Sequence, residues 1–234
     1  MPNIDSGVVA QFILFMVALV FSLSVHESAH AWMSDRFGDD LARLQGRISL
    51  NPAAHVDPIG TLLFPAIAFF TGAPLIGWAK PTPVNPLRWR NKRVANFWVS
   101  IAGVICNAII AIIAGITMRA LYEAGLVSLH LSRFSGLSAE AIGDSLIAQG
   151  GIKLLSTFFT LNVALAIFNL LPIPPLDGSK VLSSILPPSF EPALEALERF
   201  GYIILIIAVF TGVFSAIFGF IMPIVSYPFI IGLS

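Results

Sequence analysis

The chain has 234 residues, of which 56% are hydrophobic and 11% are charged, and its 13 cationic and 13 acidic side chains sum to a net charge of zero. Because soluble domains carry about 25% charged residues, this chain has too few charges to cover a globular surface in water. The composition excludes intrinsic disorder and a basic nucleic-acid-binding protein, and the single cysteine excludes a disulfide scaffold. It indicates an all-α, multi-pass membrane protein whose surroundings are the lipid bilayer.

Four apolar stretches are long enough to cross a bilayer, which takes roughly 20 residues per helix, and they cover residues 8–33, 94–121, 152–176 and 201–222. A fifth apolar stretch, 59–79, is interrupted by proline and glycine, and the tail 223–233 begins with a proline and is too short to cross alone. We predict a single membrane-embedded domain over residues 1–234. Its core covers about 8–186, and its C-terminal helical region, about 190–234, forms either one helix or a hairpin.

The first stretch contains His26-Glu27-Ser28-Ala29-His30, the pattern H-E-x-x-H in a helical context. Residues four apart share one face of a helix, so His26 and His30 can bind the same zinc ion, and Glu27 can accept a proton from water beside it. The alternative is a structural histidine pair. Ionisable groups inside a bilayer cost about 2.5–3.5 kcal/mol each, which favours a functional role.

Two cationic clusters flank the interrupted stretch 59–79. Arg36, Arg43 and Arg47 precede it, and Lys80, Arg88, Arg90, Lys92 and Arg93 follow it. Cations in short loops stay on the cytoplasmic side, so both clusters are expected there. The stretch 59–79 is then a re-entrant or interfacial element, the N-terminus and residues 122–151 lie outside, and residues 177–200 lie inside.

A catalytic zinc takes three protein ligands and keeps one position open. After elimination of the outer carboxylates and of those on exposed or loop segments, Asp177, His55 and Asp57 are left as candidates for the third ligand. Asp177 follows the third stretch at the same membrane face as His26 and His30, which favours it. The alternative is that Asp177 caps the helix that begins near Ser179.

Together these motifs resemble the site-2 protease family of intramembrane zinc metalloproteases. The resemblance rests on His26-Glu27-x-x-His30, on Ala102-Gly103 with Asn107, on Asn169-x-Leu171-Pro172 and on Pro175-Leu176-Asp177-Gly178, and it extends to Asn51-Pro52-x-x-His55-x-Asp57-Pro58 and Gly77-Trp78-Ala79-Lys80-Pro81. It implies a three-helix catalytic core with an additional transmembrane helix or hairpin, and a re-entrant or small sheet-like segment between the first two core helices. It also implies one zinc ion per chain, with His26, His30 and Asp177 as ligands and Glu27 as the catalytic base. The loop 122–150 is too short for the PDZ domain of many relatives, so we expect a compact, PDZ-free member.

Two further polar residues are candidates for substrate contact. His55 lies in a turn-rich segment, and it either stabilises that turn or reaches the site. Asn169 matches the family's placement of an asparagine near the scissile carbonyl and could donate to the oxyanion. Asn107 and Asn162 are interpreted as helix–helix hydrogen-bonding residues.

The predicted function is hydrolysis of peptide bonds in or near transmembrane segments of single-span membrane proteins, with the active site on the cytoplasmic side of the cell membrane. One alternative is a membrane metal transporter, which would need further ligands along a path. The other is a catalytically silent relative that binds membrane helices, which the intact Glu27 argues against.

Overall fold

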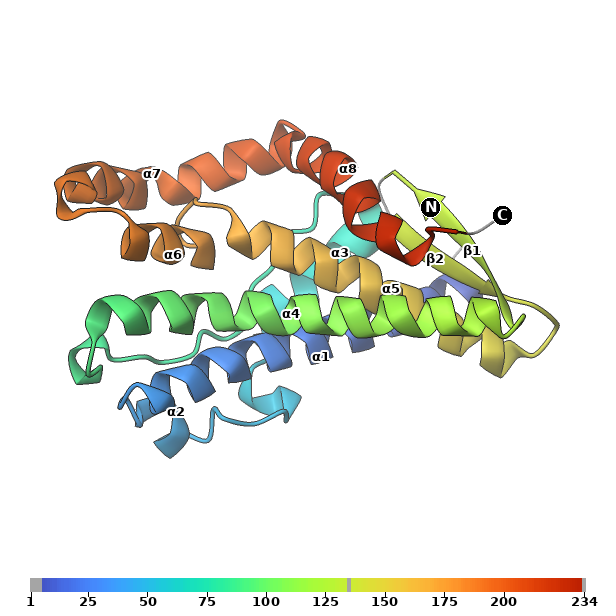
Figure 1. The fold of residues 1–234 in the computed structure, drawn as a ribbon, viewed down its shortest axis with the longest axis horizontal. Coiled ribbons are helices and arrows are strands. Elements are labelled where there is room, and N and C mark those ends of the chain that lie inside the picture. The colour runs from blue at the N-terminus through green and yellow to red at the C-terminus, as the bar shows by residue number, and fades with distance from the viewer. Residues whose placement is uncertain (1–5, 134–135, 233–234) are drawn as a thin grey trace.

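The core of the fold is a bundle of three long helices (Figure 1). The structure is a computed structural model that describes residues 6–133 and 136–232. Helices α1 (Ser6–Arg36), α4 (Lys92–Glu123) and α5 (Leu146–Leu170) pack against one another. Each of the three is long and apolar enough to cross a membrane. The structure therefore confirms helices over the first three apolar stretches.

Local sequence signals explain where these helices begin and end. The side chain of Asn91 caps α4 by accepting from the Val94 N–H, and Ser145 caps α5 by accepting from Ala148 N–H. Helix α5 ends two residues before Pro172, because a proline disfavours helical backbone in the residue before it. Small buried residues on the facing sides let the helices approach closely, and they include Ala18, Ala102, Ala111 and Ala114.

The fourth apolar stretch, 201–222, falls in two helices that together form either a broken span or a re-entrant loop. Helix α7 (Glu191–Phe210) and helix α8 (Val213–Ser226) meet at a break with a bend of 71°. Gly212 has a left-handed φ of 77° at this break, a conformation that a glycine adopts without strain. Pro223, expected to begin a separate tail, lies inside α8. The C-terminal region is thus a bent helix pair, which arches over the bundle (Figure 1).

The segment between α1 and α4 leaves one end of the bundle and returns to it. It contains α2 (Leu41–Leu44), a π-helical turn over Pro58–Leu63 and α3 (Phe64–Thr71), followed by extended chain. Lys80 N–H donates to the carbonyl of His55 at 2.8 Å, and Trp78 N–H donates to Gly60 at 3.2 Å. A Cβ on Gly60 would overlap the Trp78 indole, so the two arms of the segment touch only because residue 60 has no side chain.

The two-stranded sheet that the structure describes lies elsewhere than expected. Strands β1 (Val127–Ser132) and β2 (Gly136–Ala141) pair antiparallel between α4 and α5, with Val127 opposite Ala141 and Ser132 opposite Gly136. The expected sheet-like variant of the segment between α1 and α4 is therefore corrected: its described residues are helical or extended without strand pairing. Strand β2 packs on α5 and α8.

Both cationic clusters lie at the same end of the bundle. Arg88 forms an ion pair with Asp40, Asn85 N–H donates to the buried carboxylate of Asp39 at 2.7 Å, and Arg90 N–H donates to Phe37 at 3.0 Å. These bonds join the residues just after α1 to those just before α4. Helix α6 (Asp177–Ile185) packs on α4 near this end, and short 3₁₀ turns cover Pro52–Ala54, Pro86–Arg88, Pro188–Phe190 and Tyr227–Phe229.

Replacement of Phe159 by alanine tests the packing at the end of the bundle opposite to the cationic clusters. Phe159 is 0% exposed in the largest apolar cluster, whereas Phe220 on α8 is 70% exposed. We expect Phe159→Ala to lower the free energy of unfolding by about 3 kcal/mol, the lower end of the range for phenylalanine-to-alanine substitutions in a core. The value is at the lower end because detergent or lipid also surrounds the unfolded helices with apolar groups. Phe220→Ala is the matched control. Equal denaturant midpoints for both variants in detergent would contradict this packing.

Candidate metal centre

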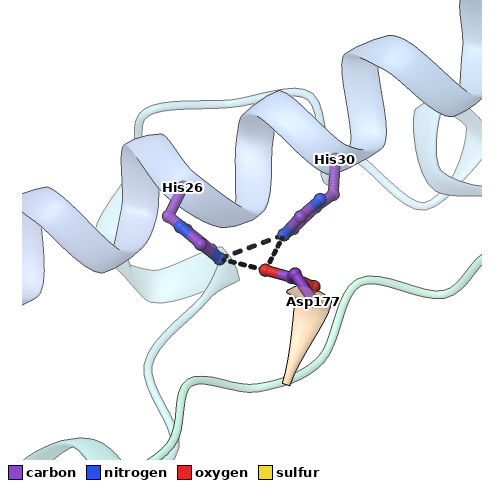
Figure 2. A group of neighbouring side chains, drawn as sticks. All are labelled: His26, His30 and Asp177. Carbon is purple, nitrogen blue, oxygen red and sulfur yellow. Dashed lines mark hydrogen bonds and ion pairs between the residues drawn. The ribbon is translucent and has the colours of Figure 1, made fainter. Parts of the chain in front are cut away.

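Three buried side chains converge on one point between α1 and α6 (Figure 2). His26 and His30 come from one face of α1, and Asp177 is the first residue of α6. The Nε2 atoms of the two histidines are 3.0 Å apart, and Asp177 Oδ2 lies 3.1 Å from His26 Nε2 and 3.2 Å from His30 Nε2. The three residues are 4%, 8% and 9% exposed.

The donor set and its spacing fit zinc. Two imidazole nitrogens and a carboxylate oxygen are common ligands of catalytic zinc, and bond lengths of about 2.0–2.1 Å in a tetrahedron put ligand atoms about 3.3 Å apart. The observed separations of 3.0–3.2 Å are close to this value. Within the described residues, this is the one group of three or more such side chains whose ligand atoms gather this closely. Three protein ligands leave a fourth position for water and substrate.

The other ring nitrogen of each histidine has its own acceptor. His30 Nδ1 lies 2.6 Å from the carbonyl of Val99, which can only accept, so His30 carries its proton on Nδ1. His26 Nδ1 lies 2.6 Å from Asn107 Oδ1. In metal-binding histidines, a hydrogen bond from Nδ1 to an acceptor of this kind orients the ring and leaves Nε2 with a lone pair. Two lone pairs and a carboxylate that meet in a buried place form a site suited to a cation.

Gly103 makes room for the His26 ring against α4. An added Cβ at this position would lie 2.5 Å from His26 Cε1 and 2.6 Å from Nδ1, closer than real contacts allow. Ala102-Gly103 with Asn107 was noted in the sequence as part of the family resemblance, but the motif does not reveal which side chain the glycine faces. The structure shows that the facing group is a side chain of the site.

Asp177 points its side chain into the site and does not cap its helix. The position before it, Leu176, is the N-cap of α6, and no side-chain capping bond is present. The Pro172–Pro175 turn redirects the chain after α5, and Gly178 lies so close to the Leu170 carbonyl that a side chain would overlap it. The geometry therefore agrees with the metal-binding orientation of Asp177 over the capping alternative.

Glu27, beside the ligand pair on α1, is held by a residue that sequence reasoning missed. Its Oε2 accepts hydrogen bonds from Thr82 N–H at 2.9 Å and from the Thr82 hydroxyl at 2.8 Å. Thr82 belongs to the extended chain that returns after α3. Glu27 is only partly buried, so its carboxylate is both fixed in direction and reachable. No local pattern links residues 55 positions apart, so this contact had no sequence signal.

His55 lies next to Ser28, one residue beyond Glu27, and is not part of the ligand group. Its Nε2 donates to the carbonyl of Ser49 at 2.7 Å and lies 3.2 Å from Ser28 Oγ. Its Nδ1 is buried and has no hydrogen-bond partner among the described residues. Burial lowers the pKa of His55, which keeps the ring neutral at physiological pH. A direct role for His55 stays a prediction.

Asn169 is placed apart from the histidine contacts. Its Nδ2 donates to the carbonyl of Leu165 in its own helix at 3.0 Å, and the residue is partly buried. Asn107 and Asn162 do form the helix–helix hydrogen bond expected of them, at 2.7 Å. Asn107 additionally contacts His26, which the sequence interpretation did not include.

Comparisons with known proteins agree with this chemistry. The family model described as peptidase family M50 matches residues 14–210. YwhC of Bacillus subtilis, whose name assigns it to the zinc metalloproteases, is 35% identical over 192 residues, which are 82% of this chain and 78% of YwhC. Rip2 of Mycolicibacterium smegmatis, whose name makes the same assignment, is 29% identical over 203 residues, which are 87% of this chain and 69% of Rip2. No solved structure matches the chain.

A methyl group at Gly103 tests the packing of the His26 ring. We expect Gly103→Ala to weaken zinc binding by about tenfold or more, because the ring must leave its present position. Gly150→Ala is the matched control, since a Cβ there meets nothing within 4 Å. Zinc affinity is measured by competition with a chelator, and equal affinity in the two variants would show that Gly103 does not position His26.

Proposed function

Because this chain belongs to peptidase family M50, the site-2 protease family, and is a zinc metallopeptidase, we propose that it hydrolyses peptide bonds in or near the transmembrane segments of single-span membrane proteins. The observation that carries this proposal is the position of the site. The three proposed ligand residues are at most 9% exposed and two of them belong to α1, a helix apolar enough to cross a membrane. A site at that depth suits substrates that are themselves in the bilayer.

His26, His30 and Asp177 would hold the zinc ion, one per chain. Zinc bound there supplies a Lewis acid that polarises the peptide carbonyl and acidifies water. Glu27 takes the proton of the attacking water and passes it to the leaving amine. The two bonds from Thr82 keep the Glu27 carboxylate in one orientation while it does so. Asn169 remains the proposed donor to the carbonyl oxygen, since one of its two Nδ2 hydrogens has no partner among the described residues.

The substrate must present an extended peptide, because the carbonyls of a helix are already hydrogen-bonded. The extended chain after α3 is the proposed clamp for such a peptide. Its Trp78 and Lys80 N–H groups are bonded to the protein itself, and alternate backbone groups of an extended chain point to the opposite side. Addition of a substrate strand along that side would supply main-chain hydrogen bonds next to Glu27.

A Glu27→Gln variant tests the proteolytic function in proteoliposomes with single-span substrates. General acid–base catalysis contributes about 10²–10⁴-fold, so we expect cleavage to fall at least about 100-fold while zinc content stays unchanged. Glu140→Gln, an exposed glutamate on β2, is the matched control. Equal cleavage by Glu27→Gln would contradict the role of Glu27.

The same proteoliposomes distinguish the alternatives. Zinc-loaded wild-type protein that cleaves none of the substrates but binds them would favour a catalytically silent relative. Zinc accumulation inside the vesicles would favour a metal transporter. The transporter alternative has less support, because the described ligands gather at one place and do not form a path.

We propose further that the protein spans the cell membrane several times with the site towards the cytoplasm and the N-terminus outside. The support is the position of both cationic clusters at one end of the bundle, together with the positive-inside rule. The segment between His55 and Lys80 would then enter the membrane and return, since its two ends are hydrogen-bonded to each other.

Cysteine labelling tests this topology. In a Cys106→Ala background, single cysteines at the exposed positions Leu44, Leu87 and Ile147 are offered to a membrane-impermeant maleimide in intact cells and in inverted vesicles. We expect positions 44 and 87 to react only in inverted vesicles and position 147 only in intact cells. Labelling of positions 44 and 87 from opposite sides would rule out the re-entrant segment.

A further inference from the structure

A chain of buried polar side chains runs from the metal centre across all three core helices. His26 Nδ1 lies 2.6 Å from Asn107 Oδ1, and Asn107 Nδ2 lies 2.7 Å from Asn162 Oδ1. Asn162 Nδ2 in turn lies 2.8 Å from Ser22 Oγ and 2.9 Å from the backbone carbonyl of Phe158. Asn107, Asn162 and Ser22 are 0% exposed, so solvent water does not exchange with these groups.

The far end of this chain determines its direction. The Phe158 carbonyl can only accept, so Asn162 must turn its NH₂ group towards it and its oxygen towards Asn107. Asn107 must then donate to Asn162 and present its own oxygen to His26. Facing an oxygen that only accepts, His26 has to carry a proton on Nδ1. The lone pair of the neutral ring is thereby assigned to Nε2, the atom beside Asp177.

The two histidines differ in how this assignment is made. For His30 the acceptor is the Val99 backbone carbonyl, which no side-chain substitution removes. For His26 the acceptor is an amide side chain that would offer a donor if it were turned around. Without Asn162, Asn107 loses the partner that holds it in the productive orientation.

We propose that Asn162 is a positioning residue for the metal centre: through Asn107 it sets the tautomer of His26 and thereby presents Nε2 to zinc. This inference rests on the proposed role of His26 as a zinc ligand. Helix α5 supplies none of the three ligands, yet through Asn162 it would influence zinc affinity.

The first test measures zinc affinity by chelator competition. We expect Asn162→Leu to weaken zinc binding about 10–100-fold, the usual effect of losing a hydrogen-bond partner that orients a metal ligand. Thr157→Val is the matched control, because Thr157 lies on the same helix, is only partly buried, and within the described residues its hydroxyl bonds the backbone carbonyl of Lys153. We expect its affinity to equal that of the wild type.

A second substitution separates positioning from packing. An aspartate at position 107 accepts from His26 Nδ1 in either orientation, so the double variant Asn107→Asp/Asn162→Leu is expected to regain zinc affinity to within about threefold of the wild type, as in carboxylate–histidine–zinc arrangements. A purely structural role for Asn162 would leave the double variant as weak as Asn162→Leu or weaker. That result would overturn the proposal.

Wild-type protein supplies a readout that needs no variant to fold. In zinc-loaded protein with ¹⁵N-labelled histidine, we expect the His26 signals to show a proton on Nδ1 and the metal on Nε2, and the reverse assignment would overturn the proposal. His26→Ala separates the two levels of the argument. Full zinc binding by His26→Ala would overturn the ligand assignment and this inference together, whereas loss in His26→Ala with unchanged affinity in Asn162→Leu would overturn the role of Asn162 alone.

Discussion

The contact between the Asp177 carboxylate and the Nε2 atoms of His26 and His30 is the interaction on which the rest of the structure depends. A carboxylate in an apolar interior costs several kcal/mol unless a charge partner and hydrogen bonds compensate it. In the proposed zinc-bound form, the compensation would come from a cation shared by His26, His30 and Asp177, which belong to two helices far apart in sequence. Metal binding and the approach of Asp177 to α1 would therefore be thermodynamically linked, as expected when a site is complete only in the folded state.

The polar side chains linked to His26 follow one rule: each is hydrogen-bonded within the protein, because all of them are buried. The rule explains the small residues nearby as much as the polar ones. Gly103 lets the His26 ring meet α4, and this approach brings Asn107 within 2.6 Å of Nδ1. Asn162 then completes a bond that would otherwise leave a buried amide unsatisfied. The close packing of the three core helices and the orientation of one ligand are consequences of the same contacts.

Sequence reasoning predicted the parts of the site that depend on local geometry. The shared face of His26 and His30 follows from helical periodicity, and the approach of Asp177 follows from the proline turn at the end of α5. The contacts of Asn107 and Thr82 depend on the rotation of α4 and on the path of a returning loop, which no local pattern encodes. The bend within 201–222 was not predicted for a related reason: hydropathy measures composition, whereas a left-handed glycine at Gly212 decides the backbone direction.

In the proposed mechanism, the returning segment between α1 and α4 would connect substrate binding to Glu27, the proposed catalytic base. Thr82, which holds Glu27, lies two residues beyond Lys80, whose N–H is bonded to His55. His55 contacts Ser28, the neighbour of Glu27 on α1. A peptide that paired with this segment would thus act on residues already bonded to both sides of Glu27. Because the carboxylate takes its orientation from Thr82 and not from the proposed zinc ligands, the proposed base would respond to the position of the segment while a bound metal stays in place.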